Sequence, residues 1–234
     1  ERTHELTIAN ERLKELDRLK SKFVSDVSHE LRTPITNLGL YVQLMQRGSA
    51  EKQERYLSVL HMQSERLKNL VEDILSLSRL ERLKGEMGLT AVNINDIITQ
   101  VIESRSIQVK VGDLTLTTTF HPELPLAQSD NDHAQQVIYN LLDNALNYTR
   151  EGGVKISTTV DVESGMICIT ITDTGAGIIE QDIPYIFDRF YRGQDVGSSA
   201  IPGTGLGLPI VQEIVELHNG RLSIESEAGK GTTA

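Results

Sequence analysis

A seven-residue spacing of apolar side chains governs the first third of the chain and limits what it can fold into. Along residues 24–45 one apolar series recurs every seven residues, with a second series three residues after it, and residues 57–74 repeat the arrangement. This pattern is the a/d seam of a coiled-coil helix. The seam residues are Val24, Val27, Leu31, Pro34, Leu38, Tyr41 and Met45 in the first stretch and Leu57, Leu60, Ser64, Leu67, Val71 and Ile74 in the second. Residues 21–84 are therefore predicted to form a helical hairpin.

Each arm of this hairpin carries one narrow apolar stripe, so a single hairpin buries little apolar surface. Pairing of two hairpins into a four-helix bundle buries both stripes, and we predict a homodimer on this ground. Upstream, residues 1–20 keep the heptad pattern but are displaced by four positions in phase, as in a coiled-coil stutter. We interpret residues 1–20 as a coiled-coil helix that passes an input signal to the hairpin. An ordinary coiled-coil irregularity is the alternative.

The composition excludes several kinds of partner. The 23 basic and 33 acidic residues give a net charge of -10, and aromatic residues make up 4% of the chain, which disfavours nucleic acid. The apolar runs are far shorter than the about 20 residues that span a bilayer, so no membrane contact is expected from these residues. The single cysteine, Cys168, excludes an internal disulfide. Since the chain lacks an initial methionine and stops just after Thr232, we expect it to be cut from a longer protein.

Residues 85–234 mix helical and strand patterns and are predicted to form one α/β sandwich domain, truncated at its C-terminus. The expected elements are a helix at 95–104, strands at 107–111 and 114–120 joined by a hairpin turn, a helix at 132–148, strands at 154–160 and 166–172, a helix at 205–218 and a strand at 221–227. A final strand after the Gly-Lys-Gly-Thr sequence at 229–232 is expected to be absent, which leaves a sheet edge unpaired.

A histidine lies on the outer face of the predicted hairpin. With Val24 at position a, His29 falls at position f, farthest from the seam. Its imidazole is therefore expected to be solvated and largely neutral near neutral pH, and a neutral imidazole is a nucleophile. The neighbouring Glu30 carboxylate can hold one ring N–H and make the other nitrogen more basic. On this pattern alone, an ordinary surface histidine is the alternative.

The second domain carries polar and glycine motifs that predict a nucleotide site. No Gly-x-x-x-x-Gly-Lys-Ser/Thr sequence occurs, so a Walker-type phosphate loop is excluded. Spacing places Asn140, Asn144 and, roughly, Asn147 on one face of a helix. An amide oxygen is a suitable ligand for Mg²⁺, which prefers oxygen and bridges phosphates. The predicted site therefore has a metal-binding amide face.

Two glycine loops complete this predicted nucleotide site. The sequence Asp173-Thr-Gly175-Ala-Gly177 follows a predicted strand, where an acceptor carboxylate and two glycines suit an adenine amino group. The sequence Gly-Thr-Gly-Leu-Gly at 203–207 leads into a helix, whose N-terminal amides and dipole can receive phosphates.

These motifs resemble a known family. Ser28-His-Glu-Leu-Arg-Thr-Pro34 resembles the phosphoacceptor segment of bacterial sensor histidine kinases of two-component systems. The series of asparagine helix, Asp-Gly loop, Phe-Asp-Arg-Phe-Tyr-Arg at 187–192 and glycine loop resembles the ATP-binding domain of the same kinases, whose fold is shared with gyrase, Hsp90 and MutL. The resemblance covers residues 21–232.

The resemblance implies a signalling kinase and a role for each motif. By this likeness His29 accepts the ATP γ-phosphoryl group, Glu30 assists as base and Thr33 positions water in a phosphatase reaction. Asn144 is expected to hold Mg²⁺, and Asp173 to read adenine. The other residues expected to bind ATP are Asn140, Asn147, Tyr148, Gly175, Gly177, Arg192, Gly203, Thr204, Gly205, Leu206 and Gly207. Residues 194–202 are expected to form a lid over the nucleotide.

The implied partner is the receiver domain of a response regulator, whose aspartate takes the phosphoryl group from His29. A cytoplasmic location is implied for these residues, with membrane anchoring through a transmembrane sensor expected for the full-length protein. Many members of the family carry a basic residue where this chain has Asn147, so one phosphate contact is missing or comes from elsewhere. The alternatives are a phosphatase-dominant regulator, a non-catalytic dimeric scaffold, and a gyrase-like or Hsp90-like ATPase.

Overall fold

The structure is a computed structural model, and it describes residues 2–47, 50–82, 88–111, 114–193 and 203–234. The chain divides into two compact units, Glu1–Glu72 and Asp73–Ala234. The predicted hairpin loop near Gly48, most of the predicted connection at 84–89 and the predicted lid at 194–202 lie outside the described residues. In the described parts of the chain, no helix is both long enough and apolar enough to cross a membrane.

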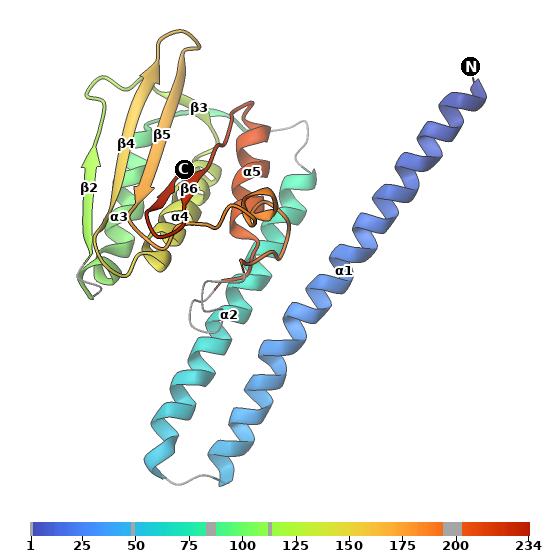
Figure 1. Ribbon diagram of the computed structural model, residues 1–234, viewed down its shortest axis with the longest axis vertical. Helices are drawn as coiled ribbons and strands as arrows, with labels where there is room; N and C mark the ends of the chain where they lie inside the picture. The colour runs from blue at the N-terminus through green and yellow to red at the C-terminus, as the bar shows by residue number, and fades with distance from the viewer. Residues whose placement is uncertain (1, 48–49, 83–87, 112–113, 194–202) are drawn as a thin grey trace. The chain divides into compact units, whose positions relative to one another are not determined.

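Two long helices build the first unit, which confirms the predicted helical hairpin. Helix α1 spans Arg2–Arg47, and helix α2 spans Ala50–Arg82 and continues into the second unit (Figure 1). The arms are joined by an edge-to-face contact between Tyr41 and Tyr56, with ring centroids 5.8 Å apart. Pro34 lies inside α1 and is buried, as expected for a seam position.

The buried face of α2 differs from the stripe that the heptad repeat predicts. Gln63, Leu70 and Leu77 are buried and recur every seven residues. By contrast, Leu57 and Val71 of the predicted stripe are 53% and 42% exposed in the single chain. The face buried within the single chain therefore lies next to the predicted stripe, and burial of that stripe against a second hairpin stays a prediction.

The second unit is built on a five-stranded sheet of order β2-β4-β5-β7-β6. Strands β2 and β4 are parallel, and the other neighbours are antiparallel. The elements are β1 (Thr90–Val92), α3 (Ile94–Val111), β2 (Thr115–Thr119), β3 (Ala127–Ser129), α4 (Asn131–Tyr148), β4 (Gly153–Asp161), β5 (Met166–Asp173), a 3₁₀ turn (Ile183–Tyr185), α5 (Gly207–Leu217), β6 (Glu225–Glu227) and β7 (Gly231–Thr233). Strands β1 and β3 form a separate antiparallel pair.

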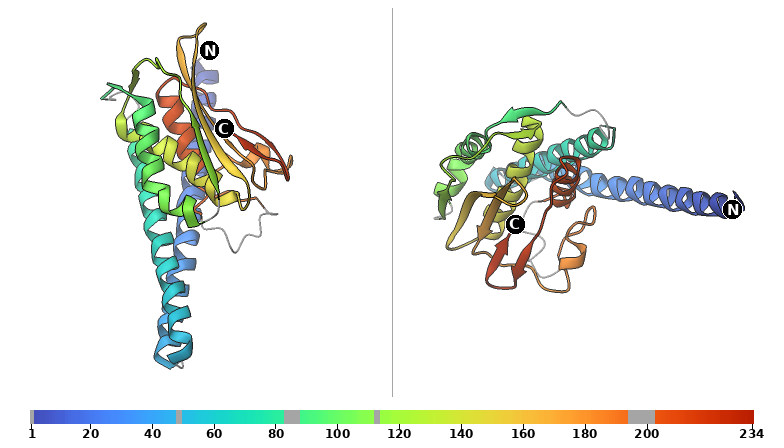
Figure 2. Two further views of the ribbon diagram at one scale, coloured as in Figure 1. Left: turned by 90° about the vertical axis from the view of Figure 1, so that its left-hand side faces the viewer. Right: turned by 90° about the horizontal axis from the view of Figure 1, so that it is seen from above.

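Helices α3, α4 and α5 lie together on one side of this sheet (Figure 2), which confirms the predicted α/β sandwich. The apolar face of α4 and alternate residues of β4, including Val154 and Ile156, are buried in one core. Helix α4 begins where the Asp130 side chain accepts hydrogen bonds from the backbone N–H groups of Asp132 and His133, an N-cap that satisfies two free helix donors. This cap fixes the start of the asparagine helix.

The predicted strand at 107–111 is wrong, because α3 continues through Val111. Ile94, Ile97, Ile98 and Val101 are buried at helical spacing, and this packed face outweighs the β-branched residues of the last turns. The predicted hairpin with residues 114–120 is wrong for the same reason. Strand β2 pairs instead with β4 in parallel.

Two predictions at the C-terminus are also corrected. The predicted strand at 221–227 is shorter, since β6 covers only Glu225–Glu227. The strand expected to be absent is present as β7 (Gly231–Thr233), which lies between β5 and β6. Ala234 and Ile171 also exchange backbone hydrogen bonds of 2.9 and 2.8 Å. The edge of β5 is therefore paired in this region.

Candidate functional site

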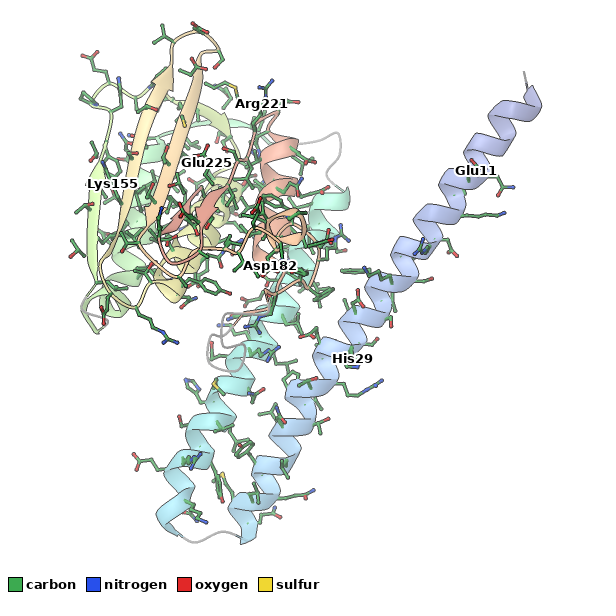
Figure 3. All side chains as sticks on the ribbon, viewed as in Figure 1. Glu11, His29, Lys155, Asp182, Arg221 and Glu225 are labelled. Atoms are coloured by element: carbon green, nitrogen blue, oxygen red, sulfur yellow. The ribbon has the colours of Figure 1, made fainter. Side chains whose placement is uncertain are left out.

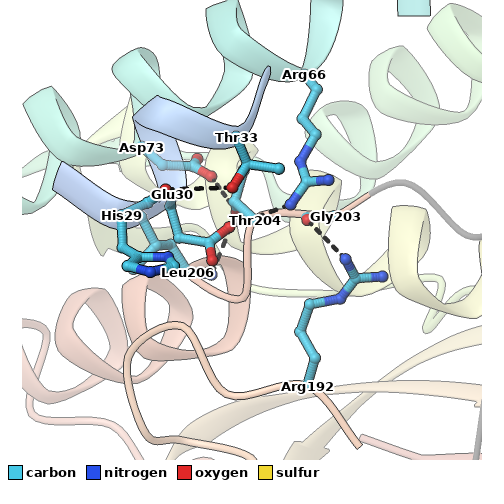
Figure 4. Close-up of polar contacts among 9 residues, drawn as sticks. All are labelled: His29, Glu30, Thr33, Arg66, Asp73, Arg192, Gly203, Thr204 and Leu206. Carbon is cyan, nitrogen blue, oxygen red and sulfur yellow. Dashed lines mark hydrogen bonds and ion pairs between the residues drawn. The ribbon is translucent and has the colours of Figure 1, made fainter. Parts of the chain in front are cut away.

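The predicted phosphoacceptor histidine lies on α1 of the first unit. His29 is exposed (Figure 3), as position f of the heptad requires. One turn later, the Thr33 hydroxyl donates to the His29 carbonyl oxygen at 3.4 Å. The Glu30 carboxylate accepts a hydrogen bond from Arg66 of α2 at 3.1 Å (Figure 4). The structure thus places His29, Glu30 and Thr33 on one turn of helix and ties Glu30 to the second arm.

The asparagines of α4 lie in the second unit, and Asn140 lies next to Gly207, the first residue of α5. A Cβ atom on Gly207 would stand 3.7 Å from Asn140 Oδ1, which is ordinary van der Waals contact. The Asn140 Nδ2 atom is buried, and no hydrogen-bond partner is found for it within the described protein. A buried amide donor almost always has a partner, so Asn140 is suited to donate to a ligand. Asn144 lies one turn further along α4 and is half-buried.

Asp173 ends β5 and is 8% exposed. Its Oδ1 atom accepts hydrogen bonds from the backbone N–H groups of Gly175 at 2.8 Å and Thr232 at 3.2 Å. Burial raises the pKa of the Asp173 carboxyl, and these two hydrogen bonds oppose the rise. The carboxylate is therefore fixed in direction at the rim of the Gly175–Gly177 loop.

The raised pKa of Asp173 predicts a pH-dependent nucleotide affinity. An ionised carboxylate is the better acceptor for an adenine amino group, so protonation weakens binding as pH falls. Because burial raises the pKa above its ordinary value of 3.8, the weakening begins at a higher pH than for an exposed aspartate. The dissociation constant of ATP, measured from about pH 8 to about pH 5, is expected to rise more steeply in the wild type than in Asp173→Asn. Titration of ATP itself is common to both proteins, and parallel profiles would contradict the prediction.

The Asp-Gly loop passes across the C-terminal end of α4. The backbone N–H of Ala176 donates to the Tyr148 carbonyl oxygen at 3.1 Å, and a Cβ on Gly175 would lie 2.4 Å from that oxygen. Gly177 has a φ angle of +66°, and a Cβ there would lie 2.0 Å from the Glu227 carbonyl oxygen. Glycine is thus required at both positions, and the loop after Asp173 is held against the backbone of Tyr148.

The second glycine loop leads into α5. The Thr204 hydroxyl donates to the Asp73 carboxylate at 2.6 Å and accepts from the Leu206 backbone N–H at 3.2 Å, and Arg192 donates to the Gly203 carbonyl oxygen at 3.4 Å (Figure 4). Helix α5 starts at Gly207 without a side-chain cap. Its first backbone N–H groups are suited to an anionic ligand.

Asn147 makes a different contact from the one expected for it. Its Nδ2 atom donates to Asp143 Oδ2 at 2.8 Å, and Asp143 in turn pairs with Arg105 of α3. Burial raises the pKa of Asp143, while Arg105 and Asn147 lower it. The direct phosphate contact of Asn147 stays a prediction.

Thr232 contacts the predicted site residue Asp173, a contact that motif spacing did not indicate. Its backbone N–H reaches Asp173 Oδ1 from β7. The nearest signal was the Gly-Lys-Gly-Thr sequence at 229–232, which was interpreted only as the approach to a further strand. A backbone donor leaves no mark on residue type, so only the β5–β7 pairing shows the contact.

Comparison with family models defines the class of this protein. Residues 129–234 match the model described as "Histidine kinase-, DNA gyrase B-, and HSP90-like ATPase", and residues 19–83 match the "His Kinase A (phospho-acceptor) domain". A phosphoacceptor hairpin followed by such an ATPase domain defines a two-domain histidine kinase region.

Individual relatives agree with this class. Drug sensory protein A of Synechocystis sp. is 35% identical over 232 residues, and the sensor histidine kinase WalK of Bacillus subtilis is 34% identical over 222 residues. These matches cover 94% and 93% of this chain but only 35% and 36% of the relatives. The Acinetobacter baumannii histidine kinase AdeS has a similar structure, with a TM-score of 0.70 and 27% identity over 88% of this chain and 94% of that chain. The chain belongs to the bacterial sensor histidine kinases and comprises a catalytic region of that family.

Proposed function

We propose that this chain is an ATP-dependent protein-histidine autokinase that phosphorylates His29 and passes the phosphoryl group to an aspartate of a response regulator. The proposal rests on the Nδ2 atom of Asn140 beside Gly207, which is buried and has no hydrogen-bond partner among the described residues. An amide donor in this position suits a phosphate oxygen, and the match to an ATPase model at residues 129–234 supports ATP as the ligand.

In this proposal one glycine loop binds the adenine of ATP and the other binds its phosphates. Asp173 accepts from the adenine amino group at the Gly175–Gly177 loop, where its Oδ1 atom is already held by two backbone donors. The phosphates lie toward Asn140 and the first turn of α5, whose backbone N–H groups and dipole favour anions. Arg192, which reaches Gly203, contributes a positive charge on this side.

The residues present fit a magnesium ion bound with the phosphates. Asn140 and Asn144 lie one turn apart on α4 and are both half-buried, and amide oxygens are ligands that Mg²⁺ accepts. We assign Asn144 as the metal ligand. The ion neutralises phosphate charge when it is bound.

The transfer step uses the exposed imidazole of His29. A ring nitrogen attacks the γ-phosphorus, the bond from that phosphorus to the β–γ bridging oxygen breaks, and ADP leaves with the bonding electrons. Glu30, held by Arg66, takes the ring proton as base. The resulting phosphoramidate then reacts with an aspartate of the regulator's receiver domain, and the same region, with Thr33, is proposed to act as a phosphatase of that regulator.

The proposal includes the assembly and its location. The exposed apolar residues of the hairpin, including Leu57 and Val71, form the surface that pairs with a second copy in a homodimeric four-helix bundle. The match of residues 19–83 to the phospho-acceptor domain supports this arrangement. We propose a cytoplasmic location for these residues.

The deciding experiment incubates the chain with γ-labelled ATP and Mg²⁺ and tests the label for acid lability and alkali stability. In Asn144→Ala the amount of label incorporated is expected to fall at least about a hundredfold, because the variant lacks the proposed metal ligand. Gln135→Ala, an exposed change on the same helix, is the matched control and is expected to label normally.

The alternatives give different results in the same experiment. Steady release of phosphate without a labelled protein would indicate a gyrase-like ATPase. A folded dimer that neither binds ATP nor takes up label would indicate a scaffold. Either result would contradict the proposed autokinase.

A further inference from the structure

A buried carboxylate lies outside the residues that the proposed function uses. Asp182 precedes the 3₁₀ turn Ile183–Tyr185 (Figure 3) and is 8% exposed. Its backbone N–H donates to the Ile179 carbonyl oxygen at 2.9 Å, and its carbonyl oxygen accepts from the Tyr185 N–H at 2.9 Å. The carboxylate therefore projects from a turn whose backbone is fixed on both sides.

The Asp182 carboxylate holds the segment that follows the turn. Its Oδ1 atom accepts a hydrogen bond of 2.7 Å from the Tyr191 hydroxyl, and this bond raises the pKa of Tyr191 to about 12. Hydrogen bonds to ionised acceptors are the strong ones. A Cβ added at Gly193 would stand only 2.4 Å from its Oδ2 atom, so the carboxylate packs against the backbone of Gly193, which has no side chain.

The segment held by Asp182 lies against the second glycine loop. The Phe190 backbone N–H donates to the Gly205 carbonyl oxygen at 2.9 Å. Gly205 has a φ of +73°, and a Cβ there would lie 2.7 Å from the Phe190 carbonyl carbon. Phe190 itself has a φ of +66°, which a bulky residue keeps only where its surroundings hold it.

We propose that Asp182 is a positioning residue for nucleotide binding. By fixing Tyr191 and Gly193, it holds the Phe190 backbone against Gly205 and thereby keeps the 203–207 loop in one conformation at the start of α5. This proposal rests on the proposed function, because it assumes that the 203–207 loop receives the phosphates of ATP. Asp182 touches neither the nucleotide nor the reacting atoms in this role.

The test measures binding of a non-hydrolysable ATP analogue with Mg²⁺ to the whole chain, together with the KM for ATP in His29 labelling. Asp182→Ala and Tyr191→Phe are each expected to weaken binding and raise the KM about tenfold, the effect of losing one hydrogen bond to a charged group. The labelling rate at saturating ATP changes less than about twofold, since the reacting groups are untouched. Asp182→Asn keeps an acceptor oxygen and restores binding to within about threefold of the wild type. Tyr185→Phe, a change on the ring that contacts Tyr191, is the control and binds normally.

Double variants show whether the residues act as one unit. The Asp182→Ala/Tyr191→Phe variant is expected to bind no more weakly than either single variant, because both changes break the same bond. Gly193→Ala is expected to weaken binding in the wild type, where its new Cβ meets the carboxylate, but to have no further effect in Asp182→Ala. Additive losses in either pair would overturn the proposal.

A measurement without nucleotide separates this proposal from the proposed function. Hydrogen exchange of the Phe190 amide is expected to be at least about tenfold faster in Asp182→Ala and in Tyr191→Phe. Tyr191→Phe breaks the same hydrogen bond without changing the buried Asp182, so it tests the proposal even if Asp182→Ala folds poorly. A wild-type chain that binds no nucleotide would contradict the proposed function. Normal wild-type binding, with unchanged affinity and exchange in Tyr191→Phe, would overturn the role of Asp182 alone.

Discussion

Replacement of His29 by glutamine is expected to abolish the acid-labile label from γ-labelled ATP while leaving ATP binding within about twofold of the wild type. His29 is exposed on α1 and belongs to the first unit, whereas the residues proposed to bind ATP belong to the second. Glutamine preserves polarity but has no ring nitrogen to form the phosphoramidate. Autoradiography of the labelled chain and titration with an ATP analogue measure the two effects separately.

His61→Gln is the matched control for this prediction, because His61 is also an exposed histidine on a hairpin helix. It is expected to label like the wild type. Label retained in His29→Gln, or lost equally in both variants, would contradict the assignment of His29. In the same series, Thr33→Ala is expected to keep the label but to lose dephosphorylation of a phosphorylated receiver domain.

Replacement of Gly177 by alanine is expected to destabilise the second unit by about 3 kcal/mol or more and to eliminate ATP binding. A left-handed residue with a Cβ costs about 1–2 kcal/mol by itself. In addition, the new Cβ would stand 2.0 Å from the Glu227 carbonyl oxygen and 2.7 Å from its carbon. These are backbone atoms of the last residue of β6, so the loop or the strand must move, which places the change among the severe core mutations.

Gly165→Ala separates the cost of conformation from the cost of collision. Gly165 has nearly the same φ, +68°, but no atom of the described residues lies within 4 Å of its added Cβ. This variant is expected to lose only about 1 kcal/mol. Calorimetric unfolding of both variants measures the difference, and equal losses would show that the contact with Glu227 is relieved at little cost.

The helical hairpin and most of the elements of the second unit were predicted from the sequence. Helix α4 and strands β4 and β5 agree with the expected ranges within one residue, because each carries a long, regular burial pattern. The errors lie where the pattern is short. Val109 and Val111 favour strand by type, yet α3 continues through them because its preceding turns are already packed.

The candidate site was predicted residue by residue but not as an arrangement. Motif spacing indicated Asn140, Asp173 and the two glycine loops, and chemistry indicated a nucleotide. It did not show that Asn147 donates to Asp143 or that Thr232 donates to Asp173. The first contact has the i, i+4 spacing of a helix pair, but spacing does not rank it above a phosphate contact. The second uses a backbone N–H, which leaves no mark on residue type.

The sequence by itself determined the hairpin, the position of His29 on its outer face and the kinds of residue available to a nucleotide. These follow from periodicity and residue chemistry, which act over a few turns of chain. Only the tertiary structure decided that β7 pairs with β5, that the Gly207 loop meets Asn140 and that Asp182 holds Tyr191. The first two join segments that are distant in sequence and meet only when the sheet and its helices pack, whereas Asp182 and Tyr191 are nine residues apart and are brought together by the turn between them. The free energy of this packing belongs to the whole domain rather than to any one motif.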